Sequence, residues 1–180
     1  MSEFKYISSK AIDYMVWDIV DQIEGVNRTF DIVVGVVRGG LVPAVMLSHR
    51  LDAKLVALHV SFRDDGRERE DILRQVDAEL QTIADLVMDG ARVLVVDDIV
   101  DGGETMKTVY DELRTRIGSA AGFIEYAALI VNRDQPFLPH YRVQDIHRST
   151  DQAWRVFPWE TKRPTEAFSS VKELLEEVSE

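Results

Sequence analysis

The sequence predicts an α/β protein with a central parallel sheet and helices on both faces of that sheet. Short β-branched runs alternate with longer stretches of helical periodicity, a pattern typical of β–α–β units. The run 31–37, DIVVGVV, is almost entirely apolar, as expected for a strand covered on both faces. Ligands of such sheets bind at the carboxyl ends of the strands, and the two most distinctive motifs of this chain both follow strands.

Periodicity and turn residues predict the order of the elements. A helix over 12–23 has Ser8 or Ser9 as its cap and Gly25 at its end. Ser170 and Glu173 predict a capping box at the start of a short final helix. After the strand at 31–37, further strands are expected at 54–60, 92–96, 123–131 and 141–146, and further helices at 41–51, 71–88 and 105–117.

Length and composition narrow the class of protein. The chain has 180 residues, 46% hydrophobic and 29% charged, which predicts a single domain over 1–180. It has no cysteine, which excludes disulfides, thiolate metal sites and a cysteine nucleophile. The formal net charge of -11 argues against nucleic-acid binding. No stretch approaches the ~20 apolar residues of a membrane helix, and no signal peptide is evident, so we expect a cytoplasmic protein.

The most informative segment is 93–105, VLVVDDIVDGGET. Two carboxylates directly after an apolar strand are costly to bury without partners. The glycines that follow precede a helix, and such a turn points several backbone N–H groups at one anion. The segment therefore offers carboxylates for hydroxyl groups or a metal ion and a backbone nest for a phosphate. Without further context, a solvated acidic turn would fit equally well.

The whole string resembles the phosphoribosyl-diphosphate (PRPP) motif of the type I phosphoribosyltransferases. The resemblance implies that Asp97 and Asp98 meet the ribose hydroxyls, directly or through Mg²⁺ bound by Asp98, and that Asp101 lies near the base and transfers a proton. The 5′-phosphate would lie against Gly102, Gly103, Glu104 and Thr105. The family usually has Thr or Ser where this chain has Gly102, so one hydroxyl donor is lost.

A second motif, Arg38-Gly39-Gly40, lies between a strand and a helix. The glycines permit positive φ values and close approach of a ligand, and Arg38 adds charge against a phosphate. A Walker A lysine and a GxGxxG pattern are absent, which disfavours nucleotide triphosphatases and Rossmann dehydrogenases. The stretch 34–51 resembles the pyrophosphate loop and following helix of xanthine–guanine phosphoribosyltransferases. That resemblance implies that Arg38, Gly39 and Gly40 bind pyrophosphate.

The segment 61–69, SFRDDGRER, reads from composition alone as a solvated loop. The family has a mobile hood at this place, which closes over PRPP and excludes water. The resemblance therefore implies pyrophosphate contacts by Ser61 and Arg63. The helix that follows is longer than expected for compact bacterial members, and a subunit interface is one option for it.

The segment 141–180 is expected to bind the base and to form the C-terminal part of the domain. Its spacing of aromatic residues resembles the base-binding segment of the xanthine–guanine enzymes, with Trp154 stacking on the purine and backbone groups of Arg155 reading the base edge. Phe157 and Trp159 are assigned to packing. The family's lysine for the purine O6 is absent, and Asn132 or Arg133 is the candidate substitute donor.

These resemblances imply transfer of 5-phosphoribosyl from PRPP to a purine base such as xanthine, guanine or hypoxanthine, with release of pyrophosphate, in purine salvage. The implied cofactor is Mg²⁺, and a homo-oligomer is expected, because members are often dimers or tetramers. The alternatives are transfer to another base and a non-catalytic regulator that senses PRPP or a nucleotide on the same fold. The four histidines lack metal-ligand spacing and are expected to be structural or surface residues.

Overall fold

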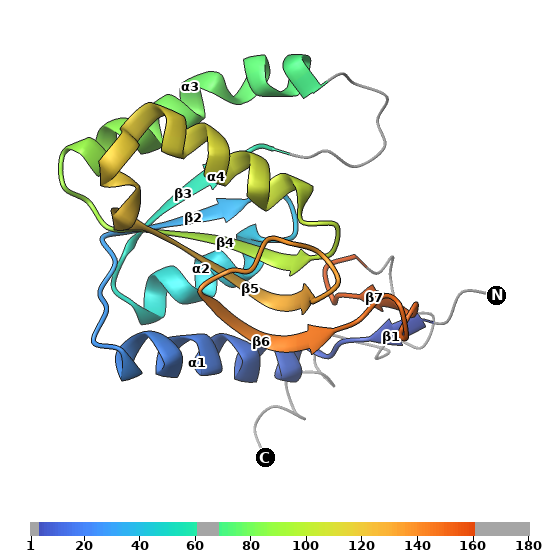
Figure 1. Ribbon diagram of the computed structural model, residues 1–180. Helices are drawn as coiled ribbons and strands as arrows, with labels where there is room; N and C mark the ends of the chain where they lie inside the picture. The colour runs from blue at the N-terminus through green and yellow to red at the C-terminus, as the bar shows by residue number, and fades with distance from the viewer. Residues whose placement is uncertain (1–3, 61–68, 161–180) are drawn as a thin grey trace, which may run out of the picture.

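The computed structural model describes residues 4–60 and 69–160 of the chain. Its centre is a five-stranded parallel sheet in the order β3-β2-β4-β5-β6 (Figure 1). This confirms the predicted α/β class and the parallel sheet. The strands are β2 (Ile32–Val36), β3 (Lys54–Leu58), β4 (Val93–Val100), β5 (Ile124–Asn132) and β6 (Tyr141–Ile146).

Helices cover both faces of the sheet, as predicted. Two of them, α1 (Ser9–Gly25) and α2 (Leu41–Arg50), pack on one face, and α3 (Arg69–Met88) and α4 (Glu104–Ile117) pack on the other. Each pair of helices encloses its own buried apolar cluster with side chains of one face of the strands. The strands alternate between these two clusters, which explains why they are apolar at nearly every position.

The first helix begins and ends where the sequence predicts. Ser8 is the cap of α1, and its hydroxyl oxygen accepts a hydrogen bond from the backbone N–H of Ala11 at 3.1 Å. This bond satisfies one of the free donors of the first helical turn. The helix ends at Gly25, and α4 is likewise closed by Gly118, whose φ is +54°.

Strand β4 is longer than the sequence predicts. We expected the strand to end at Val96 with the acid pair after it, but the strand runs to Val100 and includes both acids. The cause is its neighbour β5, which keeps pairing with it beyond the point where β2 stops. Asp97 and Asp98 therefore lie on a rigid strand, which holds their side chains more firmly than a turn would.

Three short elements were not predicted. The strands β1 (Phe4–Tyr6) and β7 (Trp154–Val156) pair in parallel as a separate two-stranded sheet beyond the carboxyl ends of the main strands. A 3-10 helix, η1 (Gly118–Phe123), connects α4 to β5. The two strands have three residues each and the 3-10 helix has six, which is too few for a periodicity to be recognised. The expected final helix from Ser170 and nearly all of the expected hood loop lie outside the described residues.

Helix α3 belongs to the core of its face. One side of it is buried against the sheet and α4, and its axis follows α4 above the strands (Figure 1). The buried positions are Ile72, Val76, Leu80, Ile83, Ala84 and Val87. In the described part of the chain, no helix combines the length and the apolar character needed to cross a membrane.

From the burial of α3 we predict how much a cavity in this helix should lower the free energy of unfolding. Leu80 is 1% exposed in the middle of α3, whereas its neighbour Gln81 is exposed. Leu80→Ala should lower the free energy of unfolding by roughly 2–5 kcal/mol, the usual cost of a cavity at a fully buried leucine. Gln81→Ala is the matched control and should change it by less than about 0.5 kcal/mol. Urea denaturation checks both values, and a small effect at Leu80 would show that α3 is not part of the core.

Candidate active site

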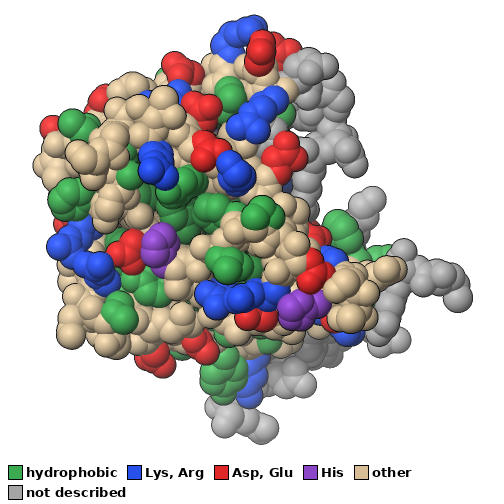
Figure 2. All heavy atoms as spheres, viewed as in Figure 1, with side chains coloured by type: hydrophobic (Ala, Val, Ile, Leu, Met, Phe, Trp, Pro, Cys, Tyr) green, Lys and Arg blue, Asp and Glu red, His purple; other side chains and the backbone are tan. Residues whose placement is uncertain are grey.

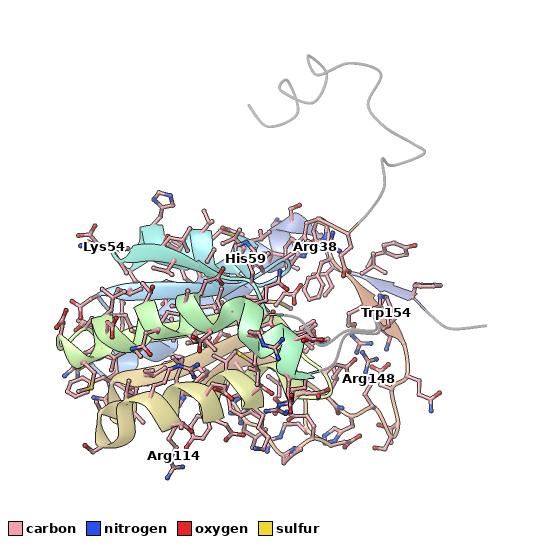
Figure 3. All side chains as sticks on the ribbon, turned by 90° about the horizontal axis from the view of Figure 1, so that it is seen from above. Arg38, Lys54, His59, Arg114, Arg148 and Trp154 are labelled. Carbon is pink, nitrogen blue, oxygen red and sulfur yellow. The ribbon has the colours of Figure 1, made fainter. Side chains whose placement is uncertain are left out.

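The carboxyl ends of β2, β4 and β5 bring the sequence motifs together at one end of the molecule. Figure 3 shows Arg38, Arg148 and Trp154 toward this end, while Lys54, at the amino end of β3, lies at the opposite end. A cavity of about 170 Å³ opens here beside β4 and the start of α4. It is lined by Asp97 and by every residue from Ile99 to Met106.

The predicted phosphate loop forms most of this cavity. Gly103 has a φ of +78° and precedes the first residue of α4, a helix of 14 residues. The unpaired backbone N–H groups of the first helical turn therefore point toward the cavity, with the positive end of the helix dipole behind them. A phosphate is the kind of ligand that this arrangement attracts.

The side chain of Gln135, which the sequence did not suggest, packs against the predicted phosphate loop at Gly103. Gln135 is 8% exposed, and its side-chain oxygen accepts a hydrogen bond from the backbone N–H of Phe137 at 2.6 Å. A Cβ on Gly103 would collide with this side-chain oxygen. The positive φ of Gly103 therefore favours glycine, and any other side chain there would also have to displace the Gln135 amide.

The two acids on β4 have different surroundings. Asp97 is partly buried and lines the cavity, whereas Asp98 is 6% exposed and does not line it. The Asp98 carboxylate accepts hydrogen bonds from the backbone N–H of Ile99 at 2.8 Å and from the indole N–H of Trp159 at 3.3 Å. Trp159, which we assigned to packing alone, therefore also holds one of the acids.

The Arg38-Gly39-Gly40 turn packs directly on the acid strand. A Cβ on Gly40 would lie 2.5 Å from the carbonyl oxygen of Val96, and a Cβ on Gly39 would collide with the Asp98 carboxylate. Neither glycine has a positive φ, so our expectation on this point was wrong. Gly40 is required because its backbone lies against the backbone of β4, and Gly39 because it lies against the Asp98 side chain. The Val37–Arg38 peptide bond is cis, and Arg38 itself is exposed at the cavity end.

Asp101 is paired with an arginine that the sequence did not suggest. Its two carboxylate oxygens accept hydrogen bonds from Nε and Nη2 of Arg148, each at 2.8 Å. The hydrogen bond to Asp101 raises the pKa of the Arg148 guanidinium above its ordinary value, against the opposing effect of burial. The two residues are 47 positions apart, so no local pattern indicates this contact.

Asn132 joins the segments on either side of this pair. Its side-chain N–H donates to the backbone carbonyl of Asp101 at 3.0 Å. Its side-chain oxygen accepts hydrogen bonds from the backbone N–H groups of Asp134 at 3.1 Å and Arg148 at 3.2 Å. Asn132 is 6% exposed, so these contacts define a supporting role. Its direct contact with a base stays a prediction. Arg133 contacts Asp145 at 3.4 Å instead.

The connector between β6 and β7 is fixed by further hydrogen bonds. Asp134 accepts from the backbone N–H of Ser149 at 2.7 Å, and its other oxygen lies 3.0 Å from Nδ1 of His147. These contacts, with that of Ser149 the largest, lower the pKa of the Asp134 carboxyl to about 2. Asp134 therefore stays ionised at neutral pH and fastens the segment that carries Arg148.

The expected base-binding residues lie on the small sheet. Trp154 pairs with Phe4 in this sheet. Because Trp154 is 46% exposed, its indole is accessible. Arg155 is 5% exposed and its guanidinium donates to Asp151 at 2.6 Å and to the carbonyl of Ala153 at 2.8 Å. Its side chain is therefore occupied, and only its backbone groups are left to contact the edge of the base, the role expected from the sequence. Phe157 is buried as predicted.

Two further predictions concern the hood and the metal ion. Ser61 and Arg63 lie outside the described residues. In the described part of the chain, no three or more histidine or acidic side chains are grouped around a potential metal position. Mg²⁺ does not need such a group, because one or two carboxylates suffice when phosphate oxygens and water complete its shell. Asp97, which lines the cavity, is a carboxylate of this kind. Asp98 is buried beside Trp159, and its binding of Mg²⁺ stays a prediction.

A sheet of this order with an acid strand, a phosphate-type loop and a glycine turn at one edge is typical of α/β proteins that handle nucleotides or sugar phosphates. Comparison with known proteins narrows this class. The model of the phosphoribosyl transferase domain family matches residues 5–164. The chain therefore belongs to the phosphoribosyl transferase family, as its motifs predicted.

Individual relatives agree with this assignment. A xanthine-guanine phosphoribosyltransferase of Cereibacter sphaeroides is 32% identical over 136 residues, which are 74% of this chain and 71% of that protein. An orotate phosphoribosyltransferase of Sulfolobus acidocaldarius is 30% identical over 68% of this chain and 52% of that protein. The crystal structure of a purine phosphoribosyltransferase from Pyrococcus horikoshii matches with a TM-score of 0.64 and 25% identity, over 92% of this chain and 99% of that one.

The close approach of the glycine turn to β4 is open to a direct test. Gly39→Ala should lower the free energy of unfolding by about 1–3 kcal/mol, because the added methyl group must displace the Asp98 carboxylate. Gly102→Ala is the control, since a Cβ at Gly102 meets no atom within 4 Å. Chemical denaturation of both variants is the measurement. Equal stability of the two would contradict the packing described for Gly39.

Proposed function

We propose that this protein transfers 5-phosphoribosyl from PRPP to a nitrogen of a purine base and releases pyrophosphate. The observation that carries this proposal is the packing of the glycine turn against the acid strand, next to a phosphate-type loop. One ligand that spans these three features would carry a phosphate at one end, a diphosphate at the other end and a hydroxylated sugar between them. PRPP has this composition.

The donor half of the site follows from these features. The 5′-phosphate would bind the loop of Gly102 to Thr105, and the ribose hydroxyls and Mg²⁺ would bind Asp97 and Asp98. The pyrophosphate would lie against the turn at Arg38. This arginine is exposed and makes no ion pair with another side chain in the part of the chain that the structure describes. It is thus available to balance the charge that develops on the leaving group.

The acceptor half is supported by Trp154 and by the relatives. An exposed indole beside the site provides a flat apolar surface for a heteroaromatic ring. We propose a 6-oxopurine as the base, because the xanthine-guanine enzyme of Cereibacter sphaeroides covers most of this chain. During transfer the C1′–O bond to pyrophosphate breaks, the base nitrogen bonds to C1′, and Asp101 accepts the proton released by the base.

Mg²⁺ would supply charge on the departing pyrophosphate oxygens, which stabilises the leaving group. The chain itself would orient the two reactants and exclude water from the reacting carbon. The cytoplasmic location, the homo-oligomer and the single domain expected from the sequence remain predictions.

A panel assay tests the function. The full-length protein is incubated with Mg²⁺, PRPP and single bases: xanthine, guanine, hypoxanthine, adenine, orotate and uracil. Pyrophosphate release should occur with at least one 6-oxopurine. Turnover with orotate alone would instead support the second candidate, a phosphoribosyltransferase for another base, which the Sulfolobus acidocaldarius relative and the missing lysine favour. PRPP binding without turnover on any base would support a non-catalytic sensor and overturn the enzymatic proposal.

Replacing the unusual Gly102 by threonine is predicted to increase the affinity for PRPP. A Cβ at this position meets no atom within 4 Å, and its φ is not in the left-handed region, so a threonine fits. Gly102→Thr restores the hydroxyl typical of the family and should tighten PRPP binding by about 2- to 10-fold, since one hydrogen bond contributes about 0.5–1.5 kcal/mol. Gly102→Val has the same shape without the hydroxyl and should not tighten binding. Calorimetric titration with Mg²⁺ and PRPP compares them, and equal affinities would refute the phosphate contact.

A further inference from the structure

Arg148 is a charged residue at the site for which the proposed reaction has so far provided no role. Its guanidinium meets both oxygens of Asp101 at 2.8 Å, and the exposed fractions of the two side chains are 21% for Arg148 and 32% for Asp101. A bidentate pair of this kind is stronger and more directional than a contact through one oxygen. Partial burial reduces its screening by water, so the pair fixes the direction of the Asp101 carboxylate.

Arg148 is itself held at two further points. Its backbone N–H donates to Asn132 at 3.2 Å, and its Nη1 donates to the carbonyl of Ala153 at 2.6 Å. Asn132 also donates to the backbone carbonyl of Asp101 at 3.0 Å. The carboxylate that would receive the base proton is thus fixed at its backbone by one residue and at its side chain by another.

The ion pair with Arg148 restricts the directions in which the Asp101 carboxylate can accept a proton. A carboxylate has about four lone-pair positions, and the arginine fork occupies one on each oxygen. The remaining positions can still accept a proton from a base. Their direction is set by the plane of the guanidinium. A lysine could not impose this orientation, because its ammonium group is a point charge without a planar fork.

We propose that Arg148 is a positioning residue for phosphoribosyl transfer, which orients the Asp101 carboxylate toward the base nitrogen and balances its charge. This inference rests on the proposed function, since it assigns a partner to the residue that receives the proton. Arg148 acts through Asp101 and needs no contact with PRPP. The turnover number should therefore depend on it much more than the affinity for PRPP does.

The test compares Arg148→Ala and Arg148→Lys with the wild-type protein on the best base of the panel. In Arg148→Ala, kcat should fall about 100-fold, on the order of the contribution of one well-placed acid–base group. Arg148→Lys should lose about 10-fold, because it keeps the charge but not the fork. The dissociation constant for PRPP should change by less than about threefold in both variants. Ethylguanidinium added to Arg148→Ala should restore part of the lost turnover.

A double variant separates action through Asp101 from a general effect. In Asp101→Asn the proton acceptor is already lost, so adding Arg148→Ala should lower kcat no further. Arg142→Ala is the matched control, because this arginine lies on β6 and contacts Asp145 at 3.1 Å. The control should keep its kcat. Thermal melting of each variant with and without PRPP establishes that the protein is folded.

The outcomes distinguish this inference from the function on which it rests. Wild-type turnover with an unchanged kcat in Arg148→Ala would overturn the role of Arg148 and leave the enzyme intact. Additive losses in the double variant, or parallel losses of kcat and PRPP affinity without rescue by ethylguanidinium, would assign Arg148 to structure alone and overturn the proposal. If the wild-type protein turns over no base, both the function and this role are wrong.

Discussion

The site depends on the close packing of one backbone against another, where the glycine turn after β2 meets the acid end of β4. The two strands are neighbours in the sheet, at the ordinary spacing of about 4.8 Å. At Gly39 and Gly40, which follow β2, the turn lies so close to β4 that there is no room for a side chain, since an added methyl group would meet Asp98 or the β4 backbone. The proposed pyrophosphate turn and the proposed ribose acids are therefore parts of one rigid unit.

A formal net charge of -11 raises the question of how this protein could bind an anionic ligand. The distribution of charge around this unit bears on that question. On the face seen in Figure 2, acidic side chains are interspersed with Lys and Arg rather than gathered in one patch. Within the site, Arg148 neutralises Asp101 and the indole of Trp159 donates to Asp98. Backbone N–H groups of the loop and Arg38 would then face the phosphates of the proposed ligand, and Asp97 is the acid of the pair that lines the cavity.

Local patterns predicted most of the fold and the elements that carry the proposed donor half of the site. Helix α1 begins at its serine cap, and the motif from Val93 to Thr105 forms a strand, a loop and the start of a helix. Both features depend on neighbours in sequence, and propensity and periodicity report such neighbours. The length of β4 was misjudged because pairing with β5, which lies more than twenty residues away, extends it.

Two of the site residues whose contacts the sequence did not indicate each meet a partner far away in the chain. Arg148 meets Asp101 across 47 positions, and Trp159 meets Asp98 across 61. An arginine in a polar connector and a tryptophan beside a proline have no local signature that assigns them to a carboxylate. The choice of partner is made by the tertiary fold, which brings the β6–β7 connector and the segment after β7 over the carboxyl ends of β4 and β5.

These long-range contacts also define how the two halves of the site are joined. The donor half is built from β2, β4 and the start of α4, and its geometry is set by the sheet. The acceptor half is built from the end of β5 and the segment that carries Trp154, and it is held by hydrogen bonds of Asn132 and Asp134. The ion pair of Asp101 and Arg148 links the halves, together with the hydrogen bonds of Asn132 to the Asp101 carbonyl and of Trp159 to Asp98. Because the proposed reaction transfers a group from one half to the other, the alignment of donor and acceptor depends on these contacts.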